Sequence, residues 1–105
     1  MPNSTQWQID FSETKIKTEY DTYFEKYPKQ SHVKRSFERD VIENPFFHHT
    51  PRRIVHLKGD LKGKLRYGKS ETRITYELDK TSHTVYPLET SKITDTSYKK
   101  RSKKK

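Results

Sequence analysis

The chain has 105 residues, which allows one small domain and excludes a protein built from separate catalytic and regulatory domains. Lys and Arg number 23 against 14 Asp and Glu, so the net charge is +9. Only 28% of the residues are hydrophobic, which is close to the composition of disordered proteins. Seven Tyr and one Trp favour instead a folded domain with a modest core, because aromatic side chains bury large areas.

Two features that the sequence lacks indicate where in the cell the protein acts. The chain has no Cys, which excludes disulfides and thiolate metal sites. It has no positive segment followed by an apolar stretch at its start, and no apolar run long enough to cross a bilayer. We therefore expect a cytoplasmic protein with no membrane partner.

The positive charge is concentrated in the second half. Residues 1–50 carry seven basic and eight acidic side chains, whereas residues 51–105 carry sixteen and six. This predicts a surface for a polyanion, and nucleic acid is the commonest large polyanion in cells. Six of the residues 99–105 are basic, which is typical of a disordered tail. We predict one domain over residues 1–98 and a basic disordered tail over 99–105. The simpler interpretation of the tail's charge is that it keeps the chain soluble.

The first half predicts a strand and two helices. Apolar residues alternate over 7–11, which indicates a short strand. Ser12 can cap a first helix, which Pro28 ends, and Ser31 can cap a second helix, which ends before Pro45. Apolar residues at helical spacing form one stripe on each helix. They are Ile16, Tyr20, Tyr23, Phe24 and Tyr27 in the first, and Val33, Phe37 and Val41 in the second.

The second half predicts strands over 53–57, 61–67, 72–78 and 84–88, separated by turn residues. Pro87 restricts the last strand to an edge or a bulge. The predicted fold class is α+β: an N-terminal strand, a helical hairpin, then a mainly antiparallel three- to four-stranded sheet with the helices on one face.

Alternation along the central strands predicts that five polar side chains share the open face of this sheet. They are Lys62, Lys64, Arg66, Arg73 and Thr75. Four cations on one face repel each other, and a bound anion relieves that repulsion. The alternative is an ordinary solvated face with cross-strand pairs to Glu77 and Glu71.

Five His residues raise the question of a second site. His48 and His49 are adjacent, but no carboxylate stands at metal-ligand spacing, so we predict neither a metal site nor a cofactor. We expect this pair on the loop after Pro45. His56 or His83 could be an acid or base in place of Lys or Tyr, and the simpler interpretation of each is a solvated side chain.

Two stretches resemble the RelE/ParE toxin superfamily, whose members often read "hLKG … yRlRvGdyRiiYei". They are residues 56–67 (HLKGDLKGKLRY) and 72–78 (TRITYEL), and the resemblance extends from about Phe11 to Tyr98. It implies the toxin of a type II toxin–antitoxin system with an acidic antitoxin as its partner. The RelE branch cleaves mRNA in the A site of the ribosome, whereas the ParE branch inhibits DNA gyrase.

The resemblance also implies site residues for a metal-independent endoribonuclease acting on ribosome-bound mRNA. The catalytic positions it implies are Lys64, Arg66, Arg73, Lys92 and Tyr98. We predict further RNA contacts at Lys58, Lys62, Lys69, Lys99, Lys100 and Arg101. RNA cleavage needs a base for the 2′-OH, neutralisation of the phosphorane and an acid for the 5′-oxygen. Arg clamps phosphate, a Lys among other cations can act as a base, and Tyr can stack or exchange a proton.

The alternative is a non-enzymatic binder, either a gyrase-inhibiting ParE-like toxin or a basic RNA-binding accessory protein. Such a binder does not require the cationic residues on one face.

Overall fold

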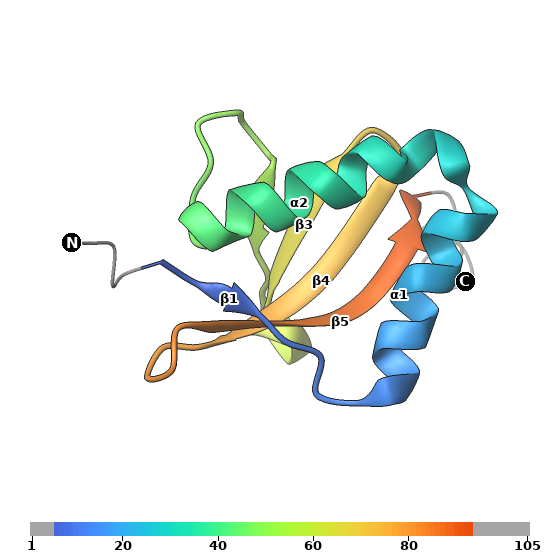
Figure 1. Ribbon diagram of the computed structural model, residues 1–105. Helices are drawn as coiled ribbons and strands as arrows, with labels where there is room; N and C mark the ends of the chain where they lie inside the picture. Colours follow the sequence, from blue (N-terminus) through green and yellow to red (C-terminus); the bar gives the residue numbers. More distant parts are fainter. Residues whose placement is uncertain (1–5, 94–105) are drawn as a thin grey trace, which may run out of the picture.

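The computed structural model describes residues 6–93 as two helices and a five-stranded sheet (Figure 1). The helices are α1 (Thr14–Lys26) and α2 (Ser31–Glu43), with the short 3-10 helices η1 (Pro28–Gln30) and η2 (Gly59–Leu61). The strands are β1 (Gln8–Ile9), β2 (Ile54–His56), β3 (Leu65–Lys69), β4 (Thr72–Asp79) and β5 (Thr84–Lys92). The predicted tail over 99–105 lies outside the described residues. Within 6–93, no helix is both long enough and apolar enough to cross a membrane.

The sheet has the strand order β1-β5-β4-β3-β2. The strands β2 to β5 form an antiparallel meander, and β1 adds to its edge parallel to β5. The N-terminal strand thus becomes the fifth strand of the sheet that the later strands build. The pairing of β4 with β5 is irregular between Thr75 and Tyr76, where Tyr76 lies opposite Pro87. This places Pro87 at a bulge, as the sequence predicted. The α+β prediction is confirmed.

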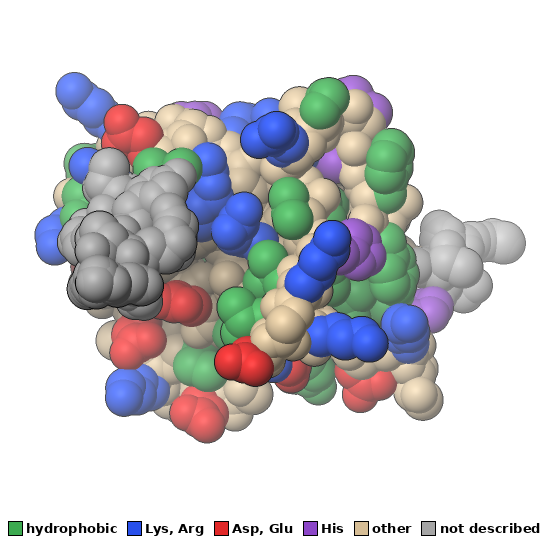
Figure 2. All heavy atoms as spheres, turned by 180° about the vertical axis from the view of Figure 1, so that it is seen from behind, with side chains coloured by type: hydrophobic (Ala, Val, Ile, Leu, Met, Phe, Trp, Pro, Cys, Tyr) green, Lys and Arg blue, Asp and Glu red, His purple; other side chains and the backbone are tan. Residues whose placement is uncertain are grey.

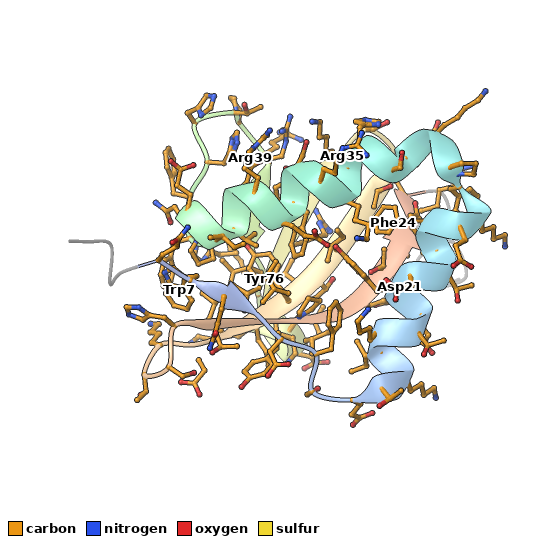
Figure 3. All side chains as sticks on the ribbon, in the orientation of Figure 1. Trp7, Asp21, Phe24, Arg35, Arg39 and Tyr76 are labelled. Carbon is orange, nitrogen blue, oxygen red and sulfur yellow. The ribbon has the colours of Figure 1, made fainter. Side chains whose placement is uncertain are left out.

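Both helices cover the same face of the sheet. Along β4 the residues Thr72, Ile74 and Tyr76 are fully buried, whereas the residues between them are half-buried. Figure 3 shows Tyr76 between the sheet and α2, with Phe24 of α1 to one side. The stripe predicted on α2 is fully buried at all three of its members, so the helix period was interpreted correctly.

Tyrosine supplies much of this core, and each of the deepest hydroxyl groups has a partner. Tyr67 donates to a carboxylate oxygen of Asp40 at 2.6 Å, and Tyr76 donates to the carbonyl oxygen of Pro45 at 2.5 Å. Tyr20 donates to Glu38 of α2 at 2.8 Å. Burying a polar group costs little once it is hydrogen-bonded. A chain with few aliphatic residues therefore builds its core from rings whose polar ends tie the helices to each other and to the sheet.

Three local predictions are wrong. The strand expected over 61–67 begins only at Leu65, because the chain forms η2 at Gly59–Leu61 and Leu61 remains 48% exposed. Ser12 does not cap α1, whose N-cap is Glu13 without a side-chain hydrogen bond. Ser31 is the first residue of α2 rather than its cap, because η1 leads directly into the helix.

Candidate functional site

The open face of the sheet carries two of the predicted arginines on neighbouring strands. Arg66 of β3 lies opposite Thr75 of β4, and Arg73 of β4 lies opposite Gly68 of β3. Their neighbours in each strand are buried against the helices, so alternation directs Arg66 and Arg73 to the other side. Figure 2 shows blue side chains together with green hydrophobic ones on the face that lies behind the view of Figure 1. This pair is the centre of the cationic face, which we define as Lys64, Arg66 and Arg73.

The guanidinium of Arg73 lies directly over Gly68. A Cβ on residue 68 would stand 3.0 Å from both Cδ and Nε of Arg73. The Nη1 group donates to the carbonyl oxygens of Ser70 at 3.1 Å and Thr72 at 2.8 Å. The glycine therefore provides room for the arginine, and the carbonyl groups of Ser70 in the turn and of Thr72 at the start of β4 orient it.

Lys64 precedes β3 and makes an ion pair with Glu77 of β4, with 3.6 Å between Nζ and Oε2. The cross-strand pairing that the sequence offered as an alternative is therefore present here. Both side chains keep about a third or more of their surface exposed, at 31% and 45%, and such surface pairs contribute little stability. An incoming phosphate can replace Glu77 as the partner of Lys64 at small cost.

A second carboxylate stands on the same face. Arg66 of β3, Thr75 of β4 and Glu89 of β5 form one row across three neighbouring strands, with Thr75 between the other two. Glu89 is exposed. The sequence analysis did not identify it, because its position depends on the bulge that shifts the register of β5. An exposed carboxylate on this face can accept a proton from a substrate hydroxyl.

Two other predicted residues lie on the helix side instead. Lys69 donates to the hydroxyl of Ser36 on α2 at 2.6 Å. Lys92 lies opposite the buried Thr72, pairs with Glu71 at 3.6 Å, and has its ammonium group 5.1 Å from the ring centroid of Tyr27 on α1. The sheet therefore separates Lys69 and Lys92 from the cationic face.

The remaining predicted residues divide between the η2 region and the C-terminal segment. Lys58 and Lys62 are exposed and flank η2. The prediction that Lys62 belongs to the open face of a strand is wrong, since no strand includes it. The others, Tyr98, Lys99, Lys100 and Arg101, lie outside the described residues.

A buried acid on α2 gathers side chains that the sequence analysis did not connect. Asp40 accepts hydrogen bonds from Tyr67 and from Nε of Arg39, the latter at 3.2 Å. His48 Nδ1 accepts the backbone N–H of Thr50 at 3.0 Å, so its Nε2 carries the proton directed at Asp40, 3.2 Å away. His48 and His49 stack with ring centroids 4.4 Å apart. The sequence did contain a sign of this group: Asp40 lies seven residues after Val33, within the apolar stripe of α2, where an acid is expected to be buried.

Burial and hydrogen bonding act against each other in this group. Burial opposes the charge on Asp40, but the bonds from Tyr67 and Arg39 and the positive charge nearby outweigh it and lower its pKa. Burial lowers the pKa of His48, and the charge of Asp40 only partly offsets this. Burial, followed by the bond to Asp40, raises the pKa of Tyr67. The neighbouring hollow, of about 570 Å³, is lined by Arg39, Glu43, Phe47, His49 and Arg53 among others. Among residues 6–93, no group of three His, Cys, Asp or Glu could hold a metal ion.

Comparison with known proteins identifies the fold. No protein-family model matches the chain, and no curated protein matches its sequence. The structure is similar to a chain in the crystal structure of the toxin–antitoxin complex RelBE2 from Mycobacterium tuberculosis, with a TM-score of 0.63 and 18% sequence identity. The match covers 83% of this chain and 98% of that chain. The chain therefore has the RelE-like fold that the resemblance of its sequence implied.

Proposed function

We propose that the chain is the toxin of a type II toxin–antitoxin system and acts in the cytoplasm as a metal-independent endoribonuclease. Its substrate is mRNA in the A site of the ribosome, and its effect is inhibition of translation. The observation that carries the proposal is the pair Arg66 and Arg73 on the open face of a RelE-like fold. The excess of positive charge in residues 51–105 supports the same substrate class.

The chemistry assigned to the cationic face follows from the shape of guanidinium. Arg66 and Arg73 hold the scissile phosphate and neutralise charge on the phosphorane, because each can offer two parallel N–H donors. Arg73 needs little reorganisation, since two backbone carbonyls already orient it. Lys64 adds a third positive charge once the phosphate displaces Glu77. The roles of Tyr98 and Lys92 stay predictions from the family motif.

The proton transfers have two candidate bases on this face. Lys64 is the one that the motif implies, and Glu89 is the one that the register of β5 adds. A 2′-OH must lose its proton as it attacks the phosphate. Glu89 can receive this proton as a carboxylate, whereas Lys64 can receive it only as a neutral amine, and in that form it no longer adds positive charge. A small domain can rely on the ribosome to hold the mRNA in line for this attack.

The proposed partner is an antitoxin with an acidic segment. The solved complex that this fold resembles contains a toxin and an antitoxin. A net charge of +9 favours an acidic partner, and a flexible segment could fold as it binds. Co-purification with the product of the adjacent gene tests the pairing, and a basic product, or a lack of toxicity when this chain is expressed alone, would refute it.

The function is tested by inducing the chain in cells and mapping the 5′ ends of mRNA. New ends within translated frames are expected for the parent and for Arg35→Ala, an arginine on the solvent side of α2 (Figure 3). They are expected to disappear in the double variant Arg66→Ala, Arg73→Ala. Intact mRNA with blocked replication would identify a gyrase inhibitor instead, and intact mRNA with normal replication would indicate an RNA-binding accessory protein.

A further inference from the structure

A pocket at one end of the sheet combines apolar walls with a cluster of lysines. It has a volume of about 420 Å³ and lies where β3 begins and β4 ends, beside the loop that follows α2. Its apolar lining is Phe46, Leu57, Leu65 and Leu78, and its cations are Lys62, Lys64 and Lys80, with His56 beside them. We call this the basic pocket. Its size lies within the range of sites for small molecules.

Among residues 6–93, no carboxylate lines the basic pocket. Glu77 pairs with Lys64 at its border. Asp79 is directed away, because its Oδ1 accepts the backbone N–H groups of Thr81 at 2.9 Å and Ser82 at 3.3 Å in the turn after β4. The pocket therefore favours an anion, which relieves the repulsion between the ammonium groups of Lys62 and Lys80 and can replace Glu77 as the partner of Lys64.

Two hydrogen bonds hold the backbone of Phe46, and its ring packs against Trp7. The backbone N–H of Phe46 donates to Oδ1 of Asn44 at 2.9 Å, and its carbonyl oxygen accepts Nε2–H of His56 at 3.1 Å. Trp7 of the N-terminal segment packs edge-on against the ring, with 5.5 Å between centroids. A half-buried aromatic ring is a platform for a planar base once the ammonium group of Lys80 above it moves aside.

Lys80 links the aromatic and the cationic parts of the pocket. It follows β4, is exposed, and has its ammonium group 5.7 Å from the ring centroid of Phe46. A base stacked on this ring would have its phosphate within reach of the same lysine. Inorganic phosphate would engage the lysines alone, whereas a nucleotide would engage both parts.

We propose that the basic pocket binds one nucleotide of a single-stranded RNA, with the base on Phe46 and the phosphate among Lys62, Lys64 and Lys80. Because Lys64 also belongs to the cationic face, this inference rests on the proposed function and extends it. The RNA strand crosses the open face at Arg66 and Arg73, and a neighbouring nucleotide turns around the end of β3 into the basic pocket. The pocket thus positions the substrate, and the cationic face contacts the bond that breaks.

The test is a titration of the full chain with adenosine 5′-monophosphate, inorganic phosphate and adenosine at low salt. Trp7, the only tryptophan, contacts Phe46 and reports occupancy by its fluorescence. Phe46→Leu, which keeps an apolar side chain, should weaken the nucleotide about five- to a hundredfold and leave inorganic phosphate unchanged. Lys80→Gln should weaken both. Lys29→Gln, in η1 beside the opposite end of β3, should change neither.

Two results would overturn the basic pocket: parent affinity for the nucleotide in Phe46→Leu, or equal losses in Lys29→Gln and Lys80→Gln. Circular dichroism checks that each variant folds. If Phe46→Leu does not fold, Lys80→Gln still tests the pocket, because Lys80 is exposed and its replacement leaves the core intact. Binding as expected while ribosome-bound mRNA stays intact supports the pocket and refutes the endoribonuclease. Cleavage at the parent rate in both pocket variants, without nucleotide binding, refutes the pocket alone.

Discussion

Replacing Gly68 by Ala should separate activity from stability. The new Cβ would stand 3.0 Å from Cδ and Nε of Arg73 and 3.2 Å from Cζ, against about 3.5–4.0 Å for a relaxed contact. The guanidinium must therefore shift by about 0.5–1 Å, which weakens its bonds to Ser70 and Thr72. A misplacement of about 1 Å in a catalytic group can cost about a hundredfold in rate. We expect cleavage of ribosome-bound mRNA to slow about ten- to a hundredfold.

The fold should tolerate this change. Gly68 is not among the residues with positive φ, so Ala can adopt its backbone conformation. Ala in a strand gains about 0.5–1 kcal/mol over Gly, which offsets part of the loss at Arg73. The free energy of unfolding, measured in urea, should change by no more than about 1 kcal/mol. In single-turnover assays, Gly68→Ala combined with Arg73→Ala should be no slower than Arg73→Ala alone. A parent rate in Gly68→Ala would refute the role given to this glycine.

Three further predictions concern the core, the buried acid and the tail. Phe37→Ala removes a fully buried ring and should lower the free energy of unfolding in urea by about 3–5 kcal/mol; a loss below about 1 kcal/mol would contradict the packing. The free energy of unfolding should also fall as the pH falls from about 7 to below 4. In the native state the pKa values of His48 and Asp40 lie below their ordinary values of 6.5 and 3.8. The unfolded chain therefore takes up protons at a higher pH than the native chain, which favours unfolding. Asp40→Asn should remove the lower part of this dependence and cost about 1–3 kcal/mol at pH 7, whereas a parent-like pH curve would refute the assignment. Deleting 99–105 should flatten the salt dependence of RNA binding without moving the cleavage positions. A shift of these positions would show that the tail helps to select the cleavage site.

The sequence could predict the cationic face because period-two alternation is local. Once β3 and β4 are recognised, Leu65 and Tyr67 on one side place Arg66 on the other, and the same logic applies to Arg73. The same alternation assigns Lys69 to the helix side, a consequence that the sequence analysis missed because Lys69 was interpreted as part of a turn.

Contacts that depend on long-range strand register could not be predicted from the sequence. Lys92 lies opposite Thr72 only because β5 extends beyond Leu88 and carries a bulge near Pro87. The same bulge decides that Glu89 faces the open side. The contact between Asp40 and His48 depends on how the loop after Pro45 returns to α2. No local period encodes that path, although an acid within an apolar helical stripe was a sign that it had buried partners.

Cleavage of mRNA on programmed ribosomes by the purified chain tests the central claim most directly. The parent and Arg35→Ala should cleave within the A-site codon at the same rate, and neither should cleave the same mRNA without ribosomes. Arg73→Ala should slow cleavage about a hundred- to a thousandfold, the usual effect of removing one donor that stabilises a transition state, while circular dichroism remains unchanged. Equal rates for the parent, Arg66→Ala and Arg73→Ala would contradict the assignment of the cationic face as the active site.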